Sequence, residues 1–263
     1  MQGPVMPTTS STAAPKPLAV WLAGRIAFDD YLVMAERLAG EAADPGGRNP
    51  TLVLCEFEPC ITIGRAGSRA DVRFADDDLR ARRIPVRFTG RGGGAVPHGP
   101  GQVVAAIFAR LVDLGVAEAD VGGFVARFQA GLAAALATAH CGSGAMLPGL
   151  HGIVGRSGLL AAVGLAVRRG VACHGAFVNV CPALDLFQRV DTIPARMRPD
   201  GAAAITMGSL EADVQRRARM QDVRTALAEG LAAAFAVPRM HVNAGFPIRI
   251  QAPRQPEIAS RVG

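Results

Sequence analysis

The chain has 263 residues, of which half are apolar and 19% are charged, as expected for a globular protein of one large or two small domains. Its formal charge of +6 favours acidic partners, but the arginines are scattered and aromatic residues make up only 5% of the chain, so we expect no nucleic-acid-binding surface. No apolar run reaches the roughly 18 residues of a membrane span, and no Cys or His spacing is typical of a metal site. We therefore expect no membrane span, no metal and no cofactor.

The two ends of the chain differ in composition from its middle. Residues 1–16 are small, polar and proline-containing, which is typical of a flexible tail, and residues 246–263 are again polar and are expected to be loose. The start also lacks the basic region and apolar stretch of a secretory signal, which favours a cytoplasmic protein with reduced thiols. Between these ends the sequence predicts a single domain over residues 17–245.

Hydrophobic periodicity predicts both strands and helices along this domain. Strands are expected at 18–23, 51–57, 60–64, 84–88 and 102–111, with two or three more in a meander within 152–180. Helices are expected with Phe28, Leu32, Ala35 and Leu38 on one face, and at 76–83, 119–139 and 221–236. This mixture, with adjacent strands late in the chain, indicates an α+β fold in which helices pack on a mixed β-sheet.

Residues 91–102 read RGGGAVPHGPGQ, and this composition predicts a stiff loop. Glycine and proline disfavour a helix interior, and a proline in a strand removes a ladder donor. Glycines let backbone N–H groups approach a ligand, and successive N–H groups can bind a carbonyl or an anion. No Gly-Lys-Ser/Thr follows, so this is not a P-loop. The stretch is either a ligand-binding loop with His98 at its centre or a structural hairpin loop.

A second histidine–glycine pair lies in CHGAFVNV, residues 173–180. His174 and Asn179 are residue types that orient a carbonyl or a peptide amide. In one flat strand they would face opposite sides, because five is an odd separation. A bend at Gly175 is therefore expected if both serve one site.

In combination these segments resemble the lipoyl(octanoyl) transferases of the biotin/lipoate protein ligase superfamily. The signature loop of that family is matched at Arg91, Gly92, Gly93, His98, Gly99, Pro100, Gly101 and Gln102. LVLCEFEPCITIGR before it and LLAAVGLAVRRGVACHGAFVNV after it resemble the flanking family segments in order and spacing. The resemblance implies the fold of the ligase catalytic domain, with a substrate site that includes Arg91, Gly92, Gly93, Gly94, His98, Gly99, Gln102, Ala162, Gly164, Gly175 and Asn179.

The resemblance also implies a reaction. Enzymes of this family take an octanoyl group from acyl carrier protein, hold it as a thioester on a cysteine, and pass it to a lysine of a lipoyl domain, while a lysine of the enzyme moves protons. Here the lysine position falls on Leu159, and the cysteine position falls near Ile193 when counted from His174. The chain contains one lysine, Lys16, near its start, so no shift of alignment restores the pair.

Three readings follow from this departure. The chain is a diverged octanoyltransferase in protein lipoylation, with Cys173 or Cys181 as its thiol, although free cysteines are commonly buried as small apolar residues. Alternatively, it is a pseudoenzyme that binds acyl chains, acyl carrier protein or lipoyl domains without turnover. A basic nucleic-acid module is the third reading, which the scattered arginines disfavour. We take the family reaction as the implied function, with His98 and His174 polarising the acyl carbonyl and octanoyl-acyl carrier protein and lipoyl-domain proteins as partners.

Overall fold

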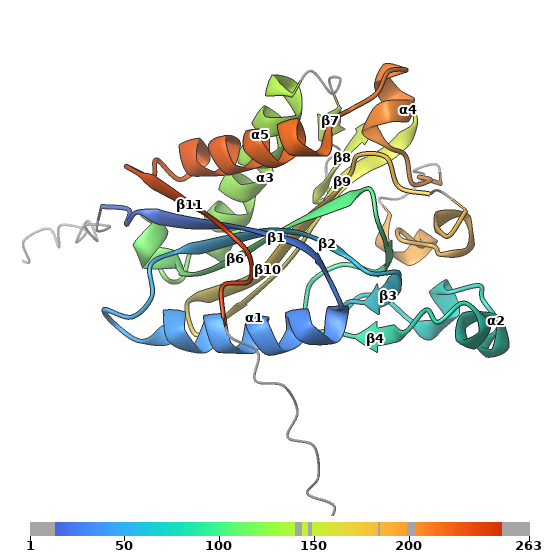
Figure 1. The fold of residues 1–263 in the computed structure, drawn as a ribbon, viewed down its shortest axis with the longest axis horizontal. Coiled ribbons are helices and arrows are strands. Elements are labelled where there is room, and N and C mark those ends of the chain that lie inside the picture. The colour runs from blue at the N-terminus through green and yellow to red at the C-terminus, as the bar shows by residue number, and fades with distance from the viewer. Residues whose placement is uncertain (1–13, 140–143, 147–148, 184, 199–203, 249–263) are drawn as a thin grey trace, which may run out of the picture.

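The computed structural model describes residues 14–139, 144–146, 149–183, 185–198 and 204–248. A mixed sheet of eight strands crosses this part of the chain in the order β11-β1-β2-β6-β10-β9-β8-β7 (Figure 1). β1 pairs in parallel with β2 and β11, and all other neighbours pair antiparallel. The strands are β1 (Leu18–Ile26), β2 (Thr51–Phe57), β6 (Gln102–Arg110), β7 (Ala145–Met146), β8 (Gly152–Gly155), β9 (Gly158–Arg168), β10 (Val171–Asn179) and β11 (Met240–Ala244).

Helices cover both faces of the large sheet (Figure 1). α3 and α5 pack on one face, where Phe124 and Leu231 join the larger apolar core. α1 covers the other face, where Tyr31 and Met34 pack on β2 and β6. This arrangement confirms the predicted α+β class. The α-helices are α1 (Phe28–Ala43), α2 (Asp76–Ala81), α3 (Val121–Thr138), α4 (Leu210–Val214) and α5 (Met220–Ala234), and short 3₁₀ helices span Arg69–Asp71, Leu111–Leu114, Phe187–Arg189 and Ala195–Met197.

A second, three-stranded sheet lies beside the start of α1 (Figure 1). Its order is β4-β3-β5, formed by Val86–Phe88, Cys60–Ile63 and Ala95–His98. Arg87 ties it to α1 through two hydrogen bonds of 2.8 Å to the Asp29 carboxylate. The strand β5 corrects our prediction for the glycine-rich stretch, which is not all loop. Pro97 is tolerated there because β5 is an edge strand, so no neighbour on its outer side needs the missing donor.

The domain extends further at both ends than the composition predicts. Lys16 Nζ lies 3.1 Å from Asp113 Oδ1, so the N-terminal tail ends before this residue. Phe246 and Ile248 pack against the core beneath α1, so residues 246–248 belong to the domain and not to a loose tail. The rest of both predicted tails, residues 1–13 and 249–263, lies outside the described residues.

By length and composition alone, α3 could cross a membrane, and it is the one helix within the described ranges for which this holds. In the structure its apolar stripe, which includes Phe128, Leu132 and Leu136, is buried in the core. α3 is therefore a helix that packs on the domain core along one face.

Candidate functional site

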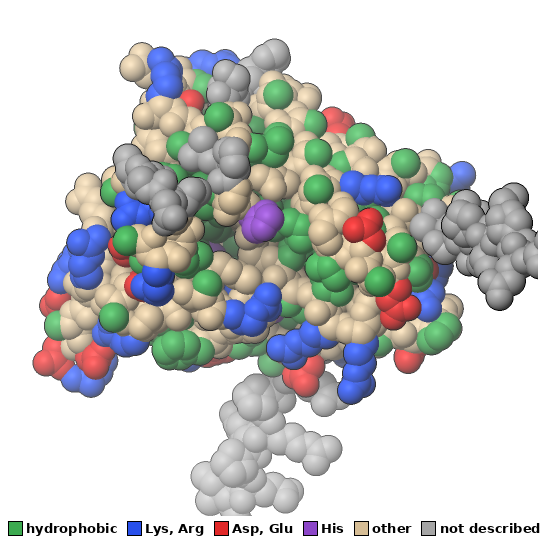
Figure 2. All heavy atoms as spheres, turned by 180° about the vertical axis from the view of Figure 1, so that it is seen from behind, with side chains coloured by type: hydrophobic (Ala, Val, Ile, Leu, Met, Phe, Trp, Pro, Cys, Tyr) green, Lys and Arg blue, Asp and Glu red, His purple; other side chains and the backbone are tan. Residues whose placement is uncertain are grey.

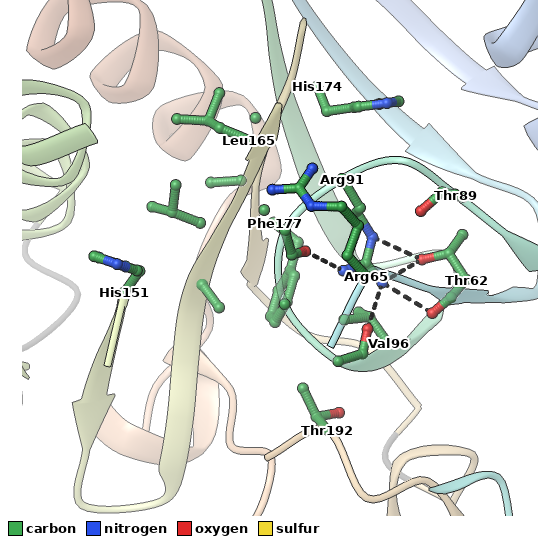
Figure 3. Close-up of a pocket in the computed structure, with 18 of the residues that line it drawn as sticks. Thr62, Arg65, Thr89, Arg91, Val96, His151, Leu165, His174, Phe177 and Thr192 are labelled. Atoms are coloured by element: carbon green, nitrogen blue, oxygen red, sulfur yellow. Dashed lines mark hydrogen bonds between the residues drawn. The ribbon is translucent and has the colours of Figure 1, made fainter. Parts of the chain in front are cut away.

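A cavity of about 430 Å³ opens between the two sheets, with α1 on one side and α3 on the other. Its walls are largely apolar and include Phe28, Phe57, Ala162 and Phe177. Figure 3 shows polar side chains reaching it from several elements, with Arg91, Thr62 and His174 grouped on one side. Such a cavity is suited to a ligand that is mainly hydrocarbon with one polar group.

The glycine loop forms one wall of the cavity and packs tightly on its own protein. The Gly92 N–H donates to the Leu165 carbonyl of β9 at 2.9 Å. A Cβ at Gly94 would lie 2.6 Å from the Thr192 carbonyl oxygen, and Gly93 has a left-handed backbone with φ of +83°. These glycines therefore allow close backbone packing as well as ligand contact.

The Arg91 guanidinium holds this loop in shape. It donates to the Gly92 and Gly94 carbonyls at 2.8 and 3.0 Å, and to the carbonyl and hydroxyl of Thr62. Burial lowers the Arg91 pKa to about 10, so the group stays charged at neutral pH. We predicted Arg91 as a substrate-binding residue. Arg91 lines the cavity, and each of its three side-chain nitrogens donates to the protein, so it positions the loop, while substrate binding by Arg91 stays a prediction.

His98 belongs to a buried relay of side-chain hydrogen bonds. The Thr62 hydroxyl accepts from Arg91 Nε and Nη2, at 3.2 and 2.7 Å, and lies 2.9 Å from His98 Nε2. Its one hydrogen therefore goes to Nε2, and His98 carries its own proton on Nδ1, which donates to Gln102 Oε1. Gln102 Nε2 donates to Asn179 Oδ1 at 2.9 Å, and Asn179 Nδ2 donates to the backbone carbonyl of Leu159 at 3.2 Å.

This relay corrects the role that we predicted for His98. Burial lowers its pKa to about 3, so it is neutral, and both ring nitrogens are already bonded within the protein. It has no N–H left to polarise an acyl carbonyl. Gln102 and Asn179 are also positioning residues rather than substrate-binding ones, since neither lines the cavity, and Gly99 lines a separate hollow beside Pro100 and Pro182.

His174 lines the cavity, and its Nε2 has no hydrogen-bond partner within the described part of the chain. Its Nδ1 lies 3.0 Å from the hydroxyl of Tyr31, a fully buried side chain whose pKa is raised well above its usual value by burial. The Tyr31 hydroxyl has no other hydrogen-bond partner among the described residues, so we assign its hydrogen to His174 Nδ1, which leaves a proton on Nε2. Burial first, and then nearby Arg91, lowers the His174 pKa to about 4. His174 is therefore a neutral N–H donor.

The predicted bend in β10 falls one residue earlier than expected. His174 itself adopts the left-handed conformation, with φ of 64°, and this turns its ring toward Tyr31 of α1. Gly175 is required for a different reason, because a Cβ there would lie 1.8 Å from the Ala105 carbonyl oxygen of β6. The structure does not bring Asn179 to the same site as His174.

Leu159 and Ile193, the two positions predicted to have lost the catalytic pair, lie together. Both are buried in one apolar cluster with Val96 and Phe177. Ile193 also lines the cavity. The structure thus brings together two positions that are distant in sequence, and both are occupied by apolar side chains.

The two thiols that we predicted as replacements do not line the cavity. Cys173 packs against the core beneath α1, and burial raises the pKa of its thiol. Cys181 is exposed and lies beside the turn at Gly101, and its pKa is also raised, by burial and by Glu211. Neither environment favours the thiolate that acyl transfer to sulfur needs.

Comparison with known proteins shows where this architecture belongs. Residues 25–232 match the family described as the lipoyl protein ligase A/B catalytic domain. The octanoyltransferase of Geotalea uraniireducens is 33% identical over 201 residues, which cover 76% of this chain and 85% of that protein. That of Geobacter metallireducens is 34% identical over 206 residues, which cover 78% and 87%. The chain belongs to the octanoyltransferase family.

Solved structures of lipoate-protein ligases share the fold of this octanoyltransferase-family chain. A lipoate-protein ligase A with bound ATP superimposes with a TM-score of 0.65 at 16% identity, covering 88% of this chain and 89% of that one. A lipoate protein ligase from T. acidophilum with bound lipoic acid also has a TM-score of 0.65, at 14% identity and the same coverage. At such identities the likeness establishes the fold alone.

Three residues that line the cavity were not predicted from the sequence. Tyr31 and Thr62 orient the two histidines, but each looks like an ordinary core position in its helix or strand. Thr192 lines the cavity next to Ile193, and its buried hydroxyl has no hydrogen-bond partner among the residues that the structure describes. Rotation about its χ1 would offer that hydroxyl to a ligand carbonyl. No local pattern marks these residues, because their partners are distant in sequence.

The two buried neutral histidines predict a specific pH dependence of stability. Both folded pKa values lie below the unfolded value near 6.5, so their contribution is fully present above pH 6.5 and is lost as the pH falls toward 4. We expect the free energy of unfolding, measured by urea titration, to fall below pH 6.5, with a slope that approaches about 1.4 kcal/mol per pH unit for each histidine near pH 5. His174→Gln should remove about half of this slope. His241→Gln, a change on an exposed strand residue, should leave it intact, and an unchanged slope in His174→Gln would contradict the assignment.

Proposed function

We propose that this octanoyltransferase-like protein binds an octanoyl thioester in its cavity and directs the acyl group to a lysine of a lipoyl domain. Acyl carrier protein is the proposed donor, and the cytoplasm the proposed location. Support comes from the similarity to octanoyltransferases over most of the chain and from the apolar cavity. The observation that carries the proposal is the neutral His174, whose Nε2–H is available to an acyl carbonyl.

The reaction that fits these residues is direct transfer without an acyl-enzyme. The thioester carbonyl oxygen accepts a hydrogen bond from His174 Nε2, which stabilises the negative charge that develops on it. The lysine nitrogen of the lipoyl domain attacks the carbonyl carbon, the carbon–sulfur bond breaks, and the proton lost by nitrogen is taken up by the departing sulfur. The products are an amide and a thiol. Neither Cys173 nor Cys181 takes part in this reaction, because neither lines the cavity.

A second function, acyl binding without turnover, is favoured by one observation. Leu159 and Ile193 are buried at the positions where the family resemblance calls for a lysine and a cysteine. A cluster that has exchanged polar groups for hydrocarbon keeps its packing but loses its proton shuttle.

Intact-protein mass spectrometry separates the two functions. After incubation with octanoyl-acyl carrier protein and an apo lipoyl domain, direct transfer predicts an octanoyl mass on the lipoyl domain and none on this chain. Cys173→Ala/Cys181→Ala should transfer at the parental rate, while His174→Ala should transfer at least tenfold more slowly. Binding of the acyl donor without a modified lipoyl domain would favour the non-catalytic function, and an adduct on either cysteine would overturn direct transfer.

A further inference from the structure

Two arginines, of which Arg65 lines the cavity, converge on Gly90. Arg65 follows β3 and lines the cavity, and its Nη1 donates to the Gly90 carbonyl. Arg168 ends β9, and its Nη2 lies 2.6 Å from the point that a Cβ on Gly90 would occupy. The two guanidinium groups therefore approach the same glycine from two separate elements.

Neither arginine has a carboxylate partner within the described part of the chain. The nearby Asp29 is taken by Arg87. Both Arg65 and Arg168 are exposed, and both lower the pKa of His174. They thus place uncompensated positive charge close to the residue that is proposed to hold the acyl carbonyl.

Arg91 does not share this role. Its guanidinium is buried and its donors are used on Thr62 and on the glycine loop. The available charge is therefore on the exposed Arg65 and Arg168 and not on the buried Arg91. In Figure 2 a histidine lies near the centre of the face, and basic and acidic side chains are interspersed around it.

We propose that Arg65 and Arg168 bind the phosphate of a phosphopantetheine thioester while its acyl chain occupies the cavity. This inference rests on the proposed function. An arginine fork forms paired, charge-assisted hydrogen bonds with a phosphate, and two forks without internal partners provide such a site at no cost in broken ion pairs. A thioester without a phosphate has no negative charge with which these arginines could pair.

Binding of two matched ligands tests the phosphate site. Octanoyl-4′-phosphopantetheine should bind the full chain at least tenfold more tightly than octanoyl-pantetheine at low salt, and the difference should shrink as salt is raised. In Arg65→Gln/Arg168→Gln the two ligands should bind within about threefold of each other, with octanoyl-pantetheine affinity close to the parental value. Arg73→Gln/Arg239→Gln removes two exposed arginines elsewhere and should preserve the difference.

The outcomes separate a failure of the phosphate site from a failure of the proposed acyl-binding function. The phosphate site is wrong if octanoyl-pantetheine binds and the phosphate adds no affinity, or if the affinity that the phosphate adds is retained in Arg65→Gln/Arg168→Gln. In both cases acyl binding in the cavity is still supported. If neither ligand binds, the proposed function itself fails. Octanoyl-AMP is the third ligand. If octanoyl-AMP binds more tightly than octanoyl-4′-phosphopantetheine, and loses more affinity in Arg65→Gln/Arg168→Gln, then phosphopantetheine is not the ligand of these arginines.

Discussion

Leu159→Lys/Ile193→Cys is expected to acquire a covalent octanoyl group from octanoyl-acyl carrier protein, where the parent acquires none. The two side chains already share one buried cluster, and Ile193 faces the cavity. An ammonium group beside the new thiol lowers its pKa and increases the thiolate fraction at neutral pH. The measurement is intact mass before and after hydroxylamine, which removes a thioester.

The single variants and a thiol-free pair are the controls. Leu159→Lys alone buries an ammonium group among hydrocarbon and should lose several kcal/mol of stability. Ile193→Cys alone carries a thiol whose burial disfavours the thiolate, so its adduct should form far more slowly. Leu159→Lys/Ile193→Ser should give no hydroxylamine-sensitive mass. A folded double variant that binds the acyl donor and stays unmodified would show that these positions do not face the acyl carbonyl.

The fold was accessible from the sequence because its signals are local. Strand and helix periodicity predicts every long element of the large sheet and of the helices on its two faces, from β1 to α5, and the spacing of the glycine loop and of CHGAFVNV led to the octanoyltransferase family. The strand β5 escaped because Pro97 and the glycines before it argue against a strand. Only its position at the edge of a small sheet makes the proline acceptable.

The roles within the site were less accessible because they depend on distant partners. The sequence marks His98 and His174 equally, yet Thr62 and Gln102 occupy both nitrogens of His98, while Tyr31 occupies only one of His174. The left-handed backbone of His174 carries no signal in the residues around it. A histidine in a motif is thus a donor or a structural relay according to contacts that are set by the tertiary fold.

Gln102→Leu is expected to be the most destabilising single change of a polar side chain in the relay. It leaves the His98 Nδ1–H, the Asn179 Oδ1 and the Pro97 carbonyl without their partner, and each unsatisfied buried group costs about 1–3 kcal/mol. A loss of roughly 3–5 kcal/mol should lower the melting temperature by about 6–20 °C, measured by calorimetry. Acyl binding should also weaken, because β5 and the end of β10 lose the bond that links them.

Gln129→Leu on α3 is the matched control for this change. Gln129 is also buried, but within the described ranges its amide makes only two contacts, both long, of 3.4 and 3.5 Å, to the carbonyls of Leu150 and Gly152. Bonds of that length contribute little, so leucine there should cost less than about 1 kcal/mol. If the two leucine variants lose equal stability, the relay from Arg91 to Asn179 is not what holds the glycine loop, and the positioning role assigned to His98 fails with it.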